Sequence, residues 1–111
     1  MADFGAVEAR LREILERCRG SLVTGEDRPG GLTLVRTGNG RPDDFVAAIR
    51  VGKRYVSYYL MSVYERPQLL DGISPELRRR MQGKSCFNFT RVDDALMTEL
   101  EALTRAGMTR S

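Results

Sequence analysis

The stretch FVAAIRVGKRYVSYYLMSVY, Phe45 to Tyr64, decides the fold because it predicts two neighbouring strands. In its first seven residues every second side chain is apolar, and alternation places these on one face of a strand. They are Phe45, Ala47, Ile49 and Val51. Gly52 and Lys53 form a short turn, and Arg54 to Tyr64 is rich in valine and tyrosine, which is typical of a long strand. The two segments therefore predict an antiparallel hairpin.

The residues before this hairpin predict a further strand. LTLVRT, Leu32 to Thr37, suits a strand, and the segment from Gly38 to Asp44 is a strong turn signal that contains Asn39-Gly40. Residues 24–31, TGEDRPGG, are interpreted as a loop by composition. An antiparallel meander of three strands is therefore expected after the first helix.

Helical patterns lie on either side of the meander. Residues 4–19 place apolar side chains three and four apart, with Asp3 as a possible N-cap and Gly20 as the stop. Pro67 to Leu70 favours a short helical turn. Ser74 and Pro75 begin a helix that we expect to continue to Gly83, with Leu77 and Met81 as its apolar pair. CFNF, Cys86 to Phe89, predicts a short strand. Asp93 or Asp94 begins a last helix that ends at Gly107.

The order is thus α-β-β-β-α-β-α. It predicts one domain over residues 1–111, an α+β two-layer sandwich in which helices cover one face of an antiparallel sheet.

Composition narrows the functional classes. The 111 residues are 41% hydrophobic and 30% charged, with a net charge of +3. Histidine is absent, which removes the commonest general base and transition-metal ligand. The two cysteines, Cys18 and Cys86, form no CxxC and are expected to be free thiols. No apolar run is long enough for a membrane span, and the start MADFGAVEARL lacks the pattern of a signal peptide. A cytoplasmic protein with no membrane partner is expected.

The segment MQGKSCFNF, Met81 to Phe89, contains Gly-Lys-Ser like the end of a phosphate-binding loop. Such a loop needs a glycine at position 78, where Arg78 stands, and it runs from a strand into a helix, whereas here a helix precedes. Gly83 is better interpreted as a helix C-cap. A nucleophilic Cys86 activated by Lys84 is an alternative, but without histidine we expect no enzyme.

Aromatic and basic residues indicate candidate binding surfaces. Strand alternation places Tyr55 and Tyr59 on one face and Tyr58 and Tyr64 on the other. Arg78 to Arg80, with Lys53, Arg54 and Lys84, are candidates for a basic patch that would bind nucleic acid weakly. The acidic pairs Asp43-Asp44 and Asp93-Asp94 are interpreted as backbone caps.

The block from Tyr55 to Phe89 resembles the core signature of the YdhG-like family, small bacterial proteins of unknown function with a frataxin-related fold. The resemblance extends from about Leu32 to Gly107 and implies helices packed on an antiparallel sheet. Some relatives are described as frataxin-like iron chaperones. Frataxins carry an acidic ridge on the first helix and first strand. Here four arginines interrupt the acids of the first helix, which are Asp3, Glu8, Glu13 and Glu16, and LTLVRT contains no acid. The polar positions that match the family's signature are Tyr58, Tyr64, Lys84, Ser85, Cys86 and Asn88.

The expected function is a non-enzymatic binding module. Its groove would lie between the tyrosine-rich strand and the strand from Lys84 to Asn88, and its partner would be a protein or a small polar ligand. An iron-binding chaperone of the frataxin kind is the alternative. No cofactor is expected for the binding module, and iron is expected only for this alternative. A weak nucleic-acid binder is a further, less favoured alternative. The sequence leaves the choice between monomer and dimer open.

Overall fold

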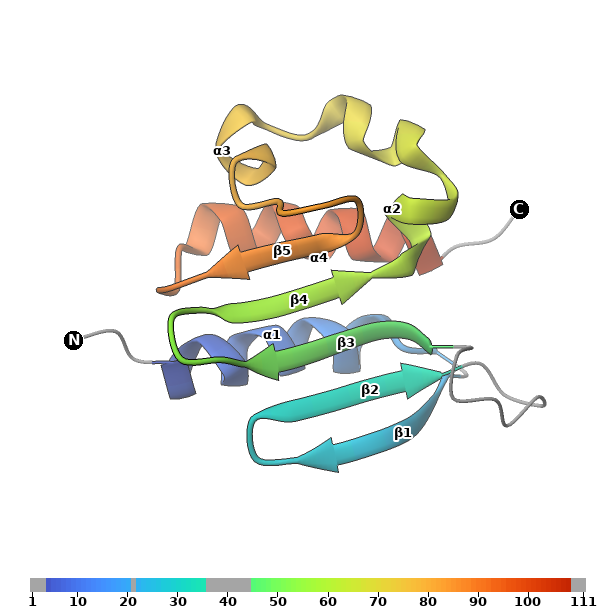
Figure 1. The fold of residues 1–111 in the computed structure, drawn as a ribbon. Helices are drawn as coiled ribbons and strands as arrows, with labels where there is room; N and C mark the ends of the chain where they lie inside the picture. The colour runs from blue at the N-terminus through green and yellow to red at the C-terminus, as the bar shows by residue number, and fades with distance from the viewer. Residues whose placement is uncertain (1–3, 21, 36–44, 109–111) are drawn as a thin grey trace.

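A computed structural model describes residues 4–20, 22–35 and 45–108. Its centre is a five-stranded antiparallel sheet in the order β1-β2-β3-β4-β5, on which α1 and α4 pack together against one face (Figure 1). The strands are β1 Val23–Arg28, β2 Gly31–Val35, β3 Phe45–Val51, β4 Val56–Leu60 and β5 Cys86–Phe89. The helices are α1 Phe4–Cys18, α2 Met61–Glu65, the 3-10 helix η1 Pro67–Gly72, α3 Pro75–Arg78 and α4 Asp94–Met108. The α+β class and the antiparallel sheet are therefore confirmed.

The predicted hairpin between β3 and β4 is confirmed. Ala47 pairs with Leu60 and Val51 with Val56, so the strands turn over Gly52 to Tyr55. β2 also pairs antiparallel with β3, as the meander requires. The predicted turn from Gly38 to Asp44 and the Asp3 cap lie outside the described residues.

The prediction of a loop at residues 24–31 was wrong, because Val23–Arg28 is the edge strand β1. All six of its residues are exposed, and a bulge at Gly25 interrupts the register. The sequence of β1 therefore lacks the alternation of apolar and polar residues by which a strand is predicted. Pro29 and Gly30 make the turn into β2, and Gly30 has a φ of 84° that suits glycine.

The long strand predicted from Arg54 to Tyr64 was also wrong at both ends. β4 begins at Val56 and ends at Leu60, where the chain turns into α2. Contacts with α4 hold α2: Ser62 Oγ donates to the carbonyl of Gly107 at 3.1 Å, and Arg66 Nη2 donates to the same oxygen at 2.8 Å. Together α2, η1 and α3 form a strap along the β5 edge of the sheet (Figure 1).

The predicted helix start at Ser74 is confirmed, since its Oγ accepts from the N–H of Leu77 at 3.1 Å. The predicted continuation to Gly83 was wrong: α3 ends at Arg78, and Met81 forms a bridge to Phe87. The chain after α3 therefore lies against β5, and Gly83, with a φ of 81°, serves the turn between them.

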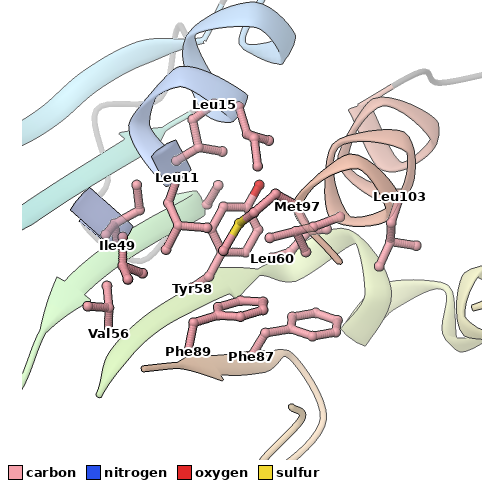
Figure 2. Packing of buried hydrophobic residues seen from close by; sticks show 14 of the residues in the cluster. Leu11, Leu15, Ile49, Val56, Tyr58, Leu60, Phe87, Phe89, Met97 and Leu103 are labelled. Atoms are coloured by element: carbon pink, nitrogen blue, oxygen red, sulfur yellow. The ribbon is translucent and has the colours of Figure 1, made fainter. Parts of the chain in front are cut away.

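The core lies between the sheet and the two long helices. Tyr58 of β4 and Phe87 and Phe89 of β5 meet residues of α1 and α4 (Figure 2). The helix residues labelled there are Leu11, Leu15, Met97 and Leu103. Across the part of the chain that is described, no helix has the length and apolar character needed to cross a membrane.

Candidate functional site

The two tyrosines among the six predicted site residues, Tyr58 and Tyr64, lie in different parts of the structure. Tyr58 is fully buried in the core, and its hydroxyl lies 2.6 Å from Thr104 Oγ1 (Figure 2). Burial raises the pKa of Tyr58, so the phenol stays neutral. Tyr64 is 53% exposed on α2 rather than on the strand face that alternation predicted. Tyr58 and Tyr64 therefore share no surface, and Tyr58 is closed to a ligand.

Lys84 and Ser85 lie in the turn before β5. Lys84 is exposed, and the carbonyl of Ser85 accepts from the N–H of Leu60 at 2.9 Å. Among the described side chains no hydrogen bond or ion pair joins Lys84 to Cys86, so the suggested activation of the thiol by Lys84 has no geometric support.

Cys86 and Asn88 are the two predicted residues that the fold brings together, on the face of β5 opposite the core. Cys86 Sγ lies 3.4 Å from Asn88 Oδ1, which also accepts from Ser57 Oγ at 2.8 Å. Asn88 Nδ2 donates to Gln82 Oε1 at 2.7 Å, so both ends of the amide are used. Burial raises the pKa of Cys86, which keeps the thiol protonated and therefore a poor nucleophile.

The open face is the sheet side away from α1 and α4 (Figure 1). The strand registers place two cross-strand rows of residues on it. The strand registers place the first row as Arg28, Gly31, Arg50, Ser57 and Asn88. They place the second as Glu26, Thr33, Ala48, Tyr59 and Cys86. The charged residues of these rows therefore lie on β1 and β3, and β2, β4 and β5 contribute uncharged side chains.

The part of this face formed by β1 to β4 contains a hollow of about 320 Å³. Gly31, Thr33 and Ala48 are small, and Phe45 and Tyr59 are the aromatic residues beside them. A Cβ at Gly31 would lie 3.1 Å from Arg28 Cζ, so the Arg28 guanidinium lies over this glycine. The hollow therefore combines uncharged residues with the charged side chains of two arginines, Arg28 and Arg50, and one acid, Glu26.

The two arginines of the hollow differ in their partners. Arg28 Nε lies 3.5 Å from Glu26 Oε1. Arg50 is exposed and forms no ion pair or hydrogen bond with any side chain of residues 4–20, 22–35 and 45–108. Arg50 is thus a cation, fixed on a central strand, whose charge no described neighbour balances.

Tyr59 and Arg50 were missing from the predicted site. A usable signal was present, since Ser57 alternates with Val56 and Tyr58, and Tyr59 shares the polar face of Ser57. Arg50 likewise alternates with buried Ile49.

No group of acidic and cysteine side chains within the described ranges could hold a metal ion. The carboxylates that an iron site on α1 would use are paired with arginines, as in Glu8–Arg12 at 2.9 Å. The other pairs are Glu13–Arg17 at 3.1 Å and Glu16–Arg19 at 2.9 Å.

Comparison with protein-family models, with curated proteins and with solved structures found no match for this chain. The resemblance to the YdhG-like family therefore remains a prediction, and any function rests on the geometry of the site.

Proposed function

We propose that this protein is a small binding module whose open sheet face binds a small ligand that combines a negative charge with a planar apolar part. The observation that carries the proposal is Arg50, a cation without an ion pair among the described residues, which lines the same hollow as Tyr59. Among the expected partners, this favours a small polar ligand over a protein.

The chemistry of the two side chains defines the ligand. A guanidinium presents a planar fork that suits carboxylate and phosphate oxygens. A tyrosine ring offers a flat apolar surface with a hydroxyl at its rim. The volume of about 320 Å³ is at the lower end of the range for small-molecule sites, which favours a ligand of one ring.

The first experiment is an amide NMR titration with three simple probes. Phenyl phosphate carries ring and charge, inorganic phosphate carries only the charge, and benzyl alcohol carries only the ring. We expect phenyl phosphate to shift amides of β2, β3 and β4 and to bind more tightly than either partial probe. Equal binding of all three, or shifts away from these strands, would contradict the proposal.

Variants then separate the contributions. Arg50→Ala should weaken phenyl phosphate about tenfold or more, because a charge-assisted hydrogen bond contributes roughly 1.5–3 kcal/mol. Tyr59→Ala should weaken it by a smaller factor. Lys84→Ala removes an exposed cation outside the hollow and should have no effect. A loss with Lys84→Ala and none with Arg50→Ala would instead favour the groove expected from the sequence.

Membership of the YdhG-like family stays part of the proposal, resting on Tyr55 to Phe89. The iron-chaperone alternative receives no support from the described carboxylates, which arginines neutralise on α1. An anaerobic calorimetric titration with ferrous iron tests it, and micromolar binding would restore it.

A further inference from the structure

A second group of cations lies at the end of the sheet where β3 stops and β4 begins. Lys53 and Arg54 occupy this turn, and both are exposed. Val56 pairs with Phe89, so Arg91, two residues beyond Phe89, lies at the same end. Figure 1 shows the end of β5 and the β3–β4 turn together on the left.

Two more arginines approach this end from the strap. Arg79 and Arg80 follow α3 and, with Arg91, line a hollow of about 150 Å³ between α3, β5 and the start of α4. The backbone there is fixed, because the N–H of Asn88 donates to the carbonyl of Arg80 at 2.7 Å. Sheet pairing thus holds cations from three separate segments in one region.

The charge of this region is not balanced locally. None of the five cations forms an ion pair with a carboxylate of the described residues, whereas the arginines of α1 do. The acids that line the hollow are Glu76 and Asp93. Asp93 Oδ1 accepts from the N–H of Leu96 at 3.3 Å and so caps α4. The five cations thus stand against two carboxylates, which leaves this region with a net charge of +3 for a partner.

An aromatic side chain lies among these cations. Tyr55 follows Arg54 directly and is 37% exposed, as one of four large hydrophobic side chains that the described surface leaves exposed. An aromatic ring that joins a track of cations is the arrangement by which proteins bind single strands, since bases stack on the ring and phosphates meet the charges.

We propose that this basic end, formed by Lys53, Arg54, Tyr55, Arg79, Arg80 and Arg91, binds single-stranded nucleic acid. One base stacks on Tyr55, and neighbouring phosphates contact the cations on either side. In a duplex the bases are stacked on one another and cannot stack on Tyr55, and an acidic peptide has no bases. Both of these ligands would therefore contact the cations of the basic end but not the ring of Tyr55. The site shares no residue with the hollow on the open face and does not depend on the function proposed there.

The experiment is fluorescence anisotropy of a labelled oligothymidylate with the full chain. If four or five phosphates are contacted, the logarithm of the association constant should fall with the logarithm of salt with a slope of about −3. An unlabelled duplex of the same length and polyglutamate should compete at least tenfold more weakly. Competition by polyglutamate as strong as that by the single strand would overturn the proposal.

Variants on the exposed turn test the two contributions. Lys53→Ala with Arg54→Ala should reduce the salt slope by about 1.5, because each lost phosphate contact removes about 0.7. Tyr55→Ala should weaken binding about tenfold, while Tyr55→Phe keeps the ring and most of the affinity. Lys84→Ala and Tyr64→Ala are the matched controls, since they remove a cation and an exposed ring beyond the opposite end of β4.

These substitutions lie on the surface, so unfolding midpoints should match the wild type. Unchanged binding by Tyr55→Ala would overturn the stacking role. Equal losses in the turn variants and the two controls would show that binding follows net charge alone and would overturn the site.

Discussion

Gly107 of α4 packs tightly against Ser62 of α2. A Cβ placed there would lie 2.6 Å from the Cβ of Ser62, which is closer than two carbon atoms tolerate. We expect Gly107→Ala to lower the free energy of unfolding by about 1–3 kcal/mol, because the overlap outweighs the gain of up to about 1 kcal/mol in helix propensity. Urea denaturation measures the change.

Gly72 offers the matched control for this substitution. Nothing lies within 4 Å of a Cβ built at Gly72. Gly72→Ala should therefore leave the unfolding free energy within about 0.5 kcal/mol of wild type. If both alanines behave alike, the close contact between α2 and α4 is not what limits position 107.

Tyr58 joins the sheet to α4 through one buried hydrogen bond. Thr104 Oγ1, its partner at 2.6 Å, also donates to the carbonyl of Leu100 at 2.8 Å. Thr104 stays satisfied when the phenol is removed, so we expect Tyr58→Phe to cost only about 1 kcal/mol in urea denaturation.

Tyr58 should also make the stability of the folded protein depend on pH in the alkaline range. Burial raises the pKa of Tyr58 above the value of about 10 in the unfolded chain. The folded state therefore holds this proton more tightly, and the stability so gained is present below about pH 10 and is lost as the pH rises further. Between about pH 9 and 11 the wild type should lose more stability than Tyr58→Phe; parallel curves would contradict this assignment.

At the scale of elements, Arg12 of α1 holds the β1–β2 hairpin in place. Its guanidinium lies 2.9 Å from both Glu8 Oε2 and Asp27 Oδ1, and it donates to the carbonyls of Arg28 at 2.7 Å and Gly31 at 3.1 Å. This half-buried arginine thus supplies a tertiary contact for an edge strand whose six residues are all exposed.

We expect Arg12→Ala to release this hairpin while the rest of the sheet persists. Hydrogen exchange of β1 and β2 amides should accelerate about tenfold or more, which corresponds to about 1.4 kcal/mol, and β3 to β5 should change less. Arg12→Lys keeps the positive charge but loses the forked guanidinium, so it should also accelerate hydrogen exchange of the β1 and β2 amides. Arg10→Ala, which loses one bond to exposed Asp94, is the control. Uniform acceleration across all strands would contradict a local role.

At the scale of the whole molecule, the first and last helices meet in one layer over the sheet, so both ends of the described chain complete the same core. Glu101 of α4 lies 3.1 Å from Arg17 of α1 and 2.8 Å from Arg105. Burial acts to raise the pKa of Glu101, but the hydrogen bonds and charges of Arg105 and Arg17 outweigh it, and the net shift is downward.

The contact between the two helices should therefore weaken in acid. Because the folded pKa of Glu101 is lowered, its stabilisation is present above the unfolded value of about 4.3 and is lost as the pH falls through the folded value. Thermal unfolding should show a shallower loss of stability below about pH 4.5 in Glu101→Gln than in wild type. Identical acid slopes would mean that Glu101 does not couple the two helices.

The sequence by itself determined the parts of this protein that local patterns encode. Alternation in Phe45 to Val51 specified a strand, steps of three and four specified α1, and Ser74-Pro75 specified a helix start. These signals depend on neighbouring residues and on one buried face, and together they were sufficient for the α+β class and for the hairpin of β3 and β4.

Tertiary structure alone decided the elements whose partners are distant in sequence. β1 exists because β2 and Arg12 hold it, and α2 replaces the end of a strand because Ser62 and Arg66 bind the carbonyl of Gly107. The candidate site is decided the same way: Arg50 and Tyr59 line one hollow only because the register aligns neighbouring strands. Side-chain period tells which face a residue takes, but only the packed sheet and helices determine which face stays open.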